Sequence, residues 1–478
     1  MGLGTIEELD LIFGPESKGS TPQERARNSS RKFVRSQIQL AEDSQEATGR
    51  SLSAWEALQA FGLDKLREVF EYNSAILSCA ANEPAQTLRN RRGDLGLSIE
   101  DVAKVTGLNK IDVENAENPK TLTSIHTIEK IARSLALDEN SVSFTHGANG
   151  DPNLATRLKT MESTHRGPEL VFQLCEAAWV SKKQHELFDW LYSRSPISLV
   201  GKGFEPSFMY GTDASYTAWM HGYYLARQAR DILKISEEQP IKCMRELIEG
   251  QLEIPLIQTV LPKIIAGATI ANGMVRGITV NTEGGNQNVW VRRMTLAHEL
   301  GHLLYDPDQK LEKLQVDKYS ELEQAPWEQK DYVEQRANAF AVDFLAPQKA
   351  TIEVFNSATD YSKGLRKVMD TFGLSYTSAK FHVWNGLDRQ IPLADLVVDN
   401  YEPTDEWKGR ESFTIDFFKP DSVPISRRGR FACLVAQSTD TNLLTEDSAA
   451  AYLGCSVEDY LSNIDVIRGI CEISNDVS

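Results

Sequence analysis

Apolar residues recur at helical spacing along much of the chain, and the character of this pattern changes at several points. Up to about residue 23 the sequence is rich in Gly, Ser and Pro, and helix-like segments such as residues 31–47 follow. These features predict a partly disordered lead followed by helices over residues 1–85. No candidate chemistry stands out in this region.

Four short amphipathic segments follow between residues 86 and 144. They read QTLRNRRGDLG, LSIEDVAKVTG, LNKIDVENAEN and LTSIHTIEKIARSLAL. Ser98 can cap the second segment, and Gly107 permits a tight turn before the third. A small core can form from Val102, Ala103, Leu108, Val113 and Ala116. The brevity of the segments and the turn predict a helix-turn-helix domain over residues 86–145.

A cluster of Gly, Asn, Asp and Pro at residues 145–153 interrupts the helical pattern and predicts a linker. Residues 146–220 then form a connecting region that is rich in aromatic residues. From His221 onward, two helical segments and a short strand lead to VRGITVN, which has the alternation of a strand. We therefore expect a further domain to occupy residues 221–390.

The last part of the chain predicts a mixed α/β region of unknown role over residues 391–478. The segments LADLVVDNY, ESFTIDFF and RFACLVAQS carry the alternation and β-branched content that are typical of strands. Two helices close the chain. Their sequence, TEDSAAAYLGCSVEDYLSNI, is punctuated by a glycine and predicts a helical hairpin.

A candidate metal-binding motif lies in MTLAHELGHLL at residues 294–304, where His298, Glu299 and His302 form the arrangement His-Glu-x-x-His. Positions i and i+4 share one face of a helix, so the two imidazoles can converge on one metal ion, with Glu299 one step round. The surrounding helix is largely apolar, and a metal removes the penalty of burying these polar side chains. The alternative is a chance match to a short motif.

A catalytic zinc ion needs a third protein ligand and one open position for water. The segment DYVEQRANAFAVDFLAP has apolar residues at helical spacing, and Glu334 lies beside its apolar stripe. A helix packed on the first could direct this carboxylate inward. Alternatively, Glu334 forms a salt bridge with Arg336 or Lys330. Two histidines and a carboxylate also suit manganese(II) or iron(II).

The run RGITVNTEGGNQNVWVRRMTLAHELGHLLYDP, together with EQRANAFAVDFLAP, resembles the ImmA/IrrE family of zinc metallopeptidases. The similarity extends over residues 223–387. It implies a zincin-like metallopeptidase domain of the gluzincin type. It also implies that His298, His302 and Glu334 bind zinc and that Glu299 is the general base that takes a proton from water.

The oxyanion that forms during peptide hydrolysis needs a hydrogen-bond donor. His382, in the segment AKFHVW, is a candidate for this role of oxyanion stabiliser. A single histidine between apolar neighbours is, however, more often a structural residue with partners of its own. The sequence leaves both interpretations open.

The four short segments between residues 86 and 145 resemble the XRE-type DNA-binding domain, and Glu117 matches a family glutamate in the second helix. Asn109, Lys110 and Asn115 are then the candidate contacts to bases or phosphates of double-stranded DNA. The charge of this segment argues against DNA binding, because the segment contains eight basic and nine acidic residues. A module used for protein contacts is therefore the alternative.

Composition narrows the class of protein. A chain of 478 residues is too long for a single domain with one hydrophobic core. Of its residues, 41% are hydrophobic and 25% are charged, and no apolar run is long enough to span a membrane. Acidic residues stand where a signal peptide would be basic, so we expect a cytoplasmic protein without a membrane partner. The net charge of -17 repels polyanions at long range. The six cysteines are scattered, and we expect them to be reduced.

The sequence thus predicts an α+β multidomain protein with a predominantly helical N-terminal half. We expect a zinc-dependent endopeptidase that cleaves a transcriptional repressor or an antitoxin-like protein and is coupled to a DNA-binding module. The alternative is a DNA-binding transcriptional regulator or antitoxin, or a stress or phage-defence component, whose peptidase-like domain mainly binds or senses. The individual substrate and its cleavage site, the activating signal and the oligomeric state are not predicted.

Overall fold

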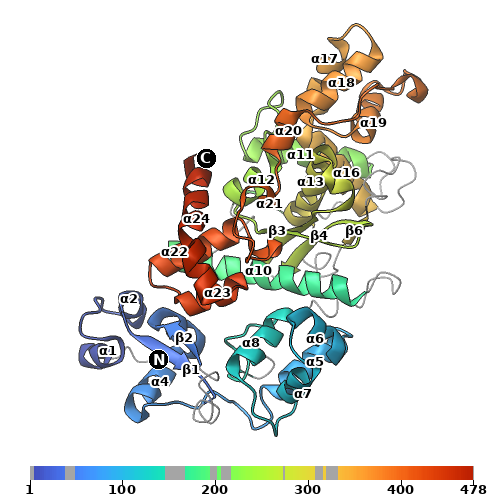
Figure 1. Ribbon diagram of the computed structural model, residues 1–478. Helices are drawn as coiled ribbons and strands as arrows, with labels where there is room; N and C mark the ends of the chain where they lie inside the picture. Colours follow the sequence, from blue (N-terminus) through green and yellow to red (C-terminus); the bar gives the residue numbers. More distant parts are fainter. Residues whose placement is uncertain are drawn as a thin grey trace. The chain divides into compact units, whose positions relative to one another are not determined.

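The computed structural model describes residues 5–37, 49–145, 167–193, 202–205, 217–272, 275–306, 316–318 and 332–476 (Figure 1). The chain divides into two compact units: residues 1–195 with 418–478, and residues 196–417. The first unit thus joins both ends of the chain, a grouping that the linear order of the five predicted segments did not anticipate. The boundaries of those segments stay predictions. Among the described residues, no helix combines the length and hydropathy needed to cross a membrane.

The first unit is mainly helical in its described residues, with one antiparallel pair of strands. Its N-terminal elements are α1 (Ile6–Phe13), α2 (Pro22–Arg27), β1 (Lys32–Arg35), β2 (Arg50–Ser53) and α4 (Ala54–Tyr72). Four short helices follow: α5 (Ala85–Asp94), α6 (Ile99–Thr106), α7 (Lys110–Ala116) and α8 (Ile125–Ser134). The remaining elements are α10 (Pro168–Tyr192), η7 (Ile425–Arg427), α22 (Arg430–Asp440), α23 (Glu446–Leu453) and α24 (Val457–Asp476).

The N-terminal region corrects two predictions. The residues expected to form a partly disordered lead contain α1, and α2 begins at their end; the threonines Thr5 and Thr21 cap these helices. The helix predicted over residues 31–47 is wrong at its start, because Lys32–Arg35 form β1 and pair with β2. A run of only four residues carries too little periodicity to separate a strand from a helix. Residues 38–48 of that prediction lie outside the described residues.

Buried charges hold the hairpin to the short helices. Glu129 on α8 lies 3.3 Å from Arg35 and 3.2 Å from Arg50, and these side chains are at most 3% exposed. An unpaired buried charge costs several kcal/mol, so removing one partner strongly destabilises the others. The ion cluster therefore fixes α8 against the β1–β2 hairpin within this unit.

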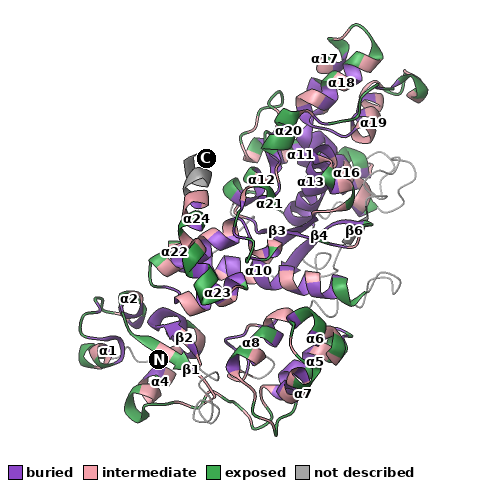
Figure 2. Ribbon diagram, viewed as in Figure 1, coloured by how far each residue is buried: buried purple, intermediate pink, exposed green. Residues whose placement is uncertain are grey.

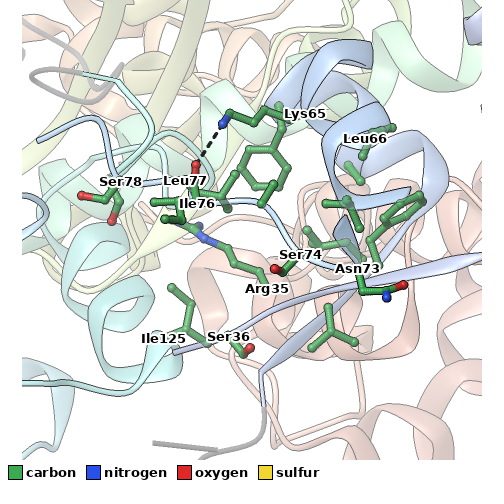
Figure 3. A pocket seen from close by; sticks show the side chains of 18 of the residues that line it. Arg35, Ser36, Lys65, Leu66, Asn73, Ser74, Ile76, Leu77, Ser78 and Ile125 are labelled. Atoms are coloured by element: carbon green, nitrogen blue, oxygen red, sulfur yellow. Dashed lines mark hydrogen bonds between the residues drawn. The ribbon is translucent and has the colours of Figure 1, made fainter. Parts of the chain in front are cut away.

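A cavity of about 920 Å³ lies beside the hairpin, lined by β1, by one face of α4 and by the loop that follows α4 (Figure 3). Apolar side chains such as Leu66 and Ile125 line it together with Arg35. Lys65 Nζ donates a hydrogen bond of 3.0 Å to the carbonyl of Ile76. This bond ties the loop to α4 at the edge of the cavity.

The four short helices predicted between residues 86 and 144 are all present, as α5 to α8. Ser98 and Asp101 form a reciprocal capping box at the start of α6, and Gly107 ends this helix in the left-handed conformation with φ of 65°. Glu117, one of the residues behind the predicted XRE-type resemblance, is buried and accepts hydrogen bonds of 2.7 and 2.8 Å from Arg92. Its observed contact is therefore structural.

The strands predicted after residue 392 are wrong, since none of the described residues 391–476 forms a strand. In the first segment, Leu396 and Val398 are buried and Val397 is 48% exposed, so the alternation is real, but no second strand pairs with it. The second contains α21 (Thr414–Phe417), and the third forms α22. The helices α23 and α24 confirm the predicted hairpin, with Gly454 left-handed between them.

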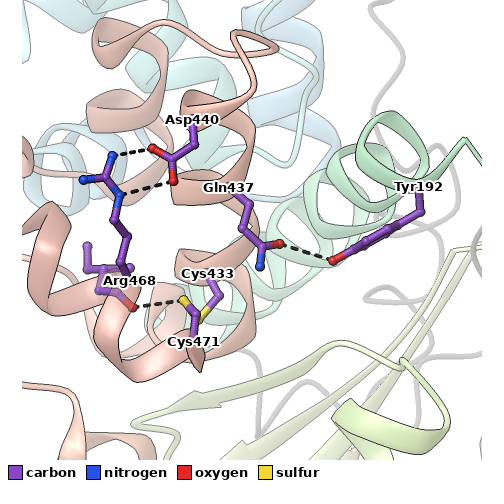
Figure 4. The surroundings of a disulfide bond; sticks show 7 residues. Tyr192, Cys433, Gln437, Asp440, Arg468 and Cys471 are labelled. Atoms are coloured by element: carbon purple, nitrogen blue, oxygen red, sulfur yellow. Dashed lines mark hydrogen bonds and ion pairs between the residues drawn. A yellow bond between two sulfur atoms is a disulfide. The ribbon is translucent and has the colours of Figure 1, made fainter. Parts of the chain in front are cut away.

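A disulfide joins Cys433 on α22 to Cys471 on α24, with their Cα atoms 5.6 Å apart (Figure 4). The prediction that all cysteines are reduced is therefore wrong for this pair. The two are separated by 38 residues, so no short spacing motif marks them, and only the packing of the two helices brings them together. On α22, Gln437 also binds Tyr192 of α10 at 3.2 Å. The cysteines outside this disulfide remain thiols: Cys79, Cys175, Cys243 and Cys455.

The second unit is an α+β arrangement around one four-stranded sheet. Its helices are α11 (Ala218–Ile232), α12 (Met244–Glu246), α13 (Val289–Tyr305), α16 (Tyr332–Leu345), α17 (Gln348–Asn356), α18 (Tyr361–Phe372), α19 (Tyr376–Gly386), α20 (Asp405–Arg410) and α21, with the short turns η4 (Leu247–Gln251), η5 (Gly284–Gln287) and η6 (Leu393–Asp395). The strands are β3 (Leu256–Thr259), β4 (Ile265–Asn272), β5 (Val275–Asn281) and β6 (Val316–Lys318), in the order β3-β5-β4-β6.

Strand β5 pairs in parallel with β3 and antiparallel with β4, and β4 pairs antiparallel with β6. Strand β6 lies in the segment that connects α13 to α16. The rest of that segment beyond Asp306 is outside the described residues. The inner strand β4 packs against α13, so the sheet supports the helix that carries the His-Glu-x-x-His motif.

Helix α13 forms the centre of this unit. Every residue of the helix except Val291 is buried, as the uniform colour along it shows (Figure 2). A helix that is apolar on most sides is stable only inside a protein, where β4 covers one face and α16 another. Trp290, Leu300, Phe340 and Phe344 belong to one continuous apolar core between these elements. The polar residues of the motif are therefore held in a dry, closely packed setting.

Candidate metal centre

Helix α13 begins at a definite point, which sets the rotation of the motif. The side chain of Asn288 accepts a hydrogen bond of 2.9 Å from the backbone of Trp290 and caps the helix. From there His298 and His302 lie one turn apart, and their Nε2 atoms are 3.0 Å from each other. Both imidazoles are at most 1% exposed. The predicted convergence of the two rings is thus present.

Helix α16 brings Glu334 to the same point. Its Oε2 lies 3.3 Å from His298 Nε2 and 3.7 Å from His302 Nε2. The helices come this close because Gly301 has no side chain: an added Cβ would stand 2.6 Å from the ring of Phe340 on α16. A substitution at Gly301 would push α16, and Glu334 with it, away from the histidines.

The three ligand atoms fit a divalent metal ion. They all lie within 4.8 Å of one another. Ligands about 2.1 Å from a tetrahedral zinc ion are about 3.4 Å apart, and the three separations of 3.0, 3.3 and 3.7 Å bracket that spacing. The donor set of two imidazoles and one carboxylate is typical of zinc and also suits manganese(II) or iron(II). Glu334 Oε2 is buried next to both Nε2 atoms, a position that a shared cation would stabilise.

The charge state of Glu334 follows from its surroundings. Burial raises the pKa of this carboxyl, but the charge of His302 and the hydrogen bonds of both histidines outweigh burial and hold the pKa well below its usual range. The group is therefore an anion at neutral pH. An anionic carboxylate between two imidazoles is the form that binds a metal ion.

A second carboxylate, Asp306, orients one of the imidazoles. His302 Nδ1 lies 2.8 Å from Asp306 Oδ2, so Nδ1 donates its proton there, and Nε2 is the nitrogen that can bind a metal ion once it has lost its own proton. Asp306 is itself bound by Arg336 from α16, and both side chains are at most 3% exposed. The sequence allowed a salt bridge between Glu334 and Arg336 as an alternative to metal binding, but Arg336 pairs with Asp306. Lys330, the other alternative, lies outside the described residues.

Strand β4 holds the carboxylate of Glu299. Thr269 Oγ1 donates a hydrogen bond of 2.7 Å to Glu299 Oε2, and Glu299 is fully buried. Beside it, Gly267 leaves room for the carboxylate, because an added Cβ would lie 2.7 Å from Glu299 Oε1 and 2.9 Å from the carbonyl of Thr279. The position of the candidate general base thus depends on two residues of a strand about thirty positions earlier.

Replacing Gly267 by alanine is expected to lower any peptidase activity of the protein by about tenfold to a hundredfold, because Glu299 must shift and a displacement of about 1 Å can cost that much. Metal content should not change, since the three atoms nearest the added Cβ belong to Glu299, Thr279 and Thr295 and not to a candidate ligand. The control is Gly250→Ala, whose Cβ meets nothing within 4 Å. Initial rates and bound zinc are the measurements. Equal rates for Gly267→Ala and the wild type would contradict this role of β4.

His382 does not have the surroundings expected of an oxyanion stabiliser. Its Nδ1 lies 2.8 Å from the hydroxyl of Tyr223, and its Nε2 lies 2.7 Å from the carbonyl of Ala346. Burial lowers the pKa of His382 to about 4. The neutral ring therefore donates from Nε2 to Ala346 and accepts from Tyr223 at Nδ1. Both nitrogens are engaged within the fold, and we correct the assignment to a structural one.

The residues proposed to contact DNA are on or beside α7. Asn109 and Lys110 are exposed, and Asn115 is half-buried. Lys110 forms an ion pair with Glu100, and this hydrogen bond raises the pKa of Lys110. Glu114 lies 3.8 Å from the same ammonium group. The lysine is thus accessible, but its charge is partly balanced by carboxylates of the same surface.

Sequence reasoning missed four residues that shape the metal centre. Asp306 could have been found, because it follows His302 at i+4 and shares its helix face. Gly301 also stands inside the motif. Thr269 and Gly267 carry no local signal, since their contact with Glu299 depends on the packing of β4 against α13.

One protein-family model matches the part of the chain that contains the three candidate ligands. Residues 286–383 match the family model of the IrrE N-terminal-like domain, a peptidase family designated M78. The segment contains α13, α16, α17, α18 and most of α19. A search of curated proteins found no significant match. Over this part of the chain, the protein thus carries an M78 peptidase domain, which supports the resemblance to the ImmA/IrrE family.

Proposed function

We propose that the protein is a zinc-dependent endopeptidase whose substrate is a transcriptional repressor or an antitoxin-like protein. The observation that carries this proposal is the convergence of His298, His302 and Glu334 beside a buried Glu299. The match of residues 286–383 to a peptidase family supports it. The nature of the substrate rests on the resemblance to the ImmA/IrrE family alone.

His298, His302 and Glu334 would hold the ion. A bound zinc ion supplies Lewis acidity, which polarises a carbonyl oxygen and lowers the pKa of water. Glu299 acts as the general base: its carboxylate takes a proton from the attacking water and gives it to the leaving amine. Thr269 keeps this carboxylate in one orientation. The apolar core around α13 excludes bulk water and strengthens these electrostatic interactions.

Comparison of protein termini in living cells tests this function for a substrate of any sequence. Cells that express the wild-type chain should contain new N-termini that are absent from cells expressing Glu299→Gln at the same level. We expect these termini to map to few proteins, among them a DNA-binding repressor or an antitoxin-like protein. Identical sets of termini in the two strains would contradict the proposed proteolysis.

A second candidate function is binding of double-stranded DNA by the helices α5 to α8. It is favoured by the exposure of Asn109 and Lys110 at the start of α7. In this alternative the protein is a transcriptional regulator, an antitoxin or a stress or phage-defence component, and its peptidase-like domain mainly binds or senses. The ion pair between Lys110 and Glu100 would have to open for phosphate contact.

Selection from a random duplex library measures this second function. If it is correct, Lys110→Ala should weaken binding to all selected sequences and reduce the salt slope by about one. Asn109→Ala should change the preferred bases, and Lys130→Ala on the exposed face of α8 serves as the control. Selected DNA that binds both α7 variants like the wild type would refute this surface. Failure to select any duplex would favour a module for protein contacts.

A further inference from the structure

A small cavity of about 110 Å³ lies in the second unit between α11, α16 and α19. Its walls are formed in part by Tyr223 of α11, Met294 of α13 and Val342 of α16. Thr377 and Phe381 of α19 complete the opposite side. None of these residues belongs to the candidate metal centre, and the cavity has no role in the chemistry assigned to Glu299.

The cavity adjoins the metal centre through two helices. Met294 precedes His298 by one turn of α13, and Asn338 follows Glu334 by one turn of α16. Residues four apart share one face of a helix. Each helix therefore turns one metal-binding side chain and one cavity-lining side chain in the same direction. A peptide whose scissile bond lies at the metal centre can place a neighbouring side chain in the cavity.

The lining selects against charge. Tyr223, Met294 and Val342 are at most 8% exposed and present apolar surface. His382, which also lines the cavity, is neutral because burial lowers its pKa to about 4. Among the lining residues, only Arg389 carries a full charge, and it is exposed, with its guanidinium 4.8 Å from the ring of Trp384. A charged substrate side chain would lose its hydration here without gaining a buried counter-ion.

The volume limits the size of the occupant. A cavity of about 150 Å³ in another protein holds one benzene molecule, and the cavity here is smaller, at about 110 Å³. We propose that it is a specificity pocket that binds a compact apolar side chain, of leucine, isoleucine or methionine, next to the scissile bond of the substrate. This inference rests on the proposed peptidase function and adds the substrate class to it.

The test uses the full chain loaded with zinc and a library of unstructured peptides, with cleavage sites read by mass spectrometry. The wild type should prefer leucine, isoleucine or methionine over glycine at one position beside the cleaved bond, by at least about tenfold. Thr377→Phe fills the cavity from α19, and Val342→Phe fills it from α16. Either variant should abolish this preference while peptides with glycine there are still cut. Thr371→Phe on α18, another half-buried threonine outside the cavity, is the control.

Binding without catalysis gives an independent measurement. We expect the zinc-loaded Glu299→Gln variant to bind peptidyl hydroxamates with leucine beside the chelating group at least about tenfold more tightly than those with glycine. Thr377→Phe in that background should remove the difference.

The outcomes separate the two proposals. Cleavage without a side-chain preference, or with one that both cavity variants retain, would overturn the pocket and leave the peptidase function intact. Absence of cleavage would overturn the peptidase function. In that case hydroxamate binding tests the specificity pocket. Tighter binding of the leucine compound that Thr377→Phe removes would support the pocket, and equal affinities for the glycine and leucine compounds would overturn it.

Discussion

Replacing Glu299 by glutamine is expected to lower peptide hydrolysis by about a hundredfold to ten-thousandfold, the usual contribution of a general base. The amide cannot take a proton from water at neutral pH. Its oxygen can still accept the hydrogen bond from Thr269, and the three candidate ligands are untouched, so the fold and the bound metal should be retained. Initial rates on quenched fluorescent peptides and zinc content by mass spectrometry are the measurements.

The control for this substitution is Glu353→Gln, an equivalent change at an exposed position of α17. It should leave both rate and zinc content unchanged. Hydrolysis by Glu299→Gln at the rate of the wild type would exclude Glu299 as the base. Loss of zinc together with activity would assign Glu299 to metal binding or folding instead.

Replacing Asp306 by asparagine is expected to lower zinc affinity by about tenfold to a hundredfold, the range found for the partners of metal-binding histidines. Asp306 fixes the proton of His302 on Nδ1 and balances the buried charge of Arg336. Without it, both Nε2 orientation and the local charge balance are lost. The dissociation constant should be measured by competition with a chelator.

A purely structural role of Asp306 would predict a different result. If Asp306 positions His302, activity of the Asp306→Asn variant should recover in excess zinc, whereas a misfolded protein would stay inactive. Asp370→Asn removes a carboxylate that pairs with Arg366 elsewhere in the same unit, and it controls for the loss of an ion pair. Wild-type zinc affinity in Asp306→Asn would refute the positioning role.

The local part of the metal centre could be predicted because its signals are periodic. His298 and His302 stand at i and i+4, and Glu334 lies beside an apolar stripe that marks the buried side of α16. The apolar stripe predicted which side of α16 is buried, but it did not predict that α13 covers that side. Arg336 pairs with Asp306 rather than with Glu334 because α16 packs against α13, and no local sequence pattern specifies that packing.

Long-range contacts explain what the sequence did not reveal. Glu299 is held by Thr269 from β4, and Cys433 meets Cys471 across two helices; neither contact follows from a spacing rule. Residues 393–401 illustrate the opposite error. Their alternation describes which side chains are buried, but a strand also needs a hydrogen-bonding partner, and that segment has none in the described sheets.

If His298, His302 and Glu334 bind one metal ion, anomalous diffraction at the zinc edge will locate that ion directly. Crystals of the zinc-loaded wild-type protein should show one strong peak within bonding distance of the two Nε2 atoms and the Glu334 carboxylate. The peak should disappear in His302→Ala and persist in Glu299→Gln. Absence of a peak at these residues in the wild type, or a peak that His302→Ala leaves unchanged, would exclude a metal site formed by these three residues.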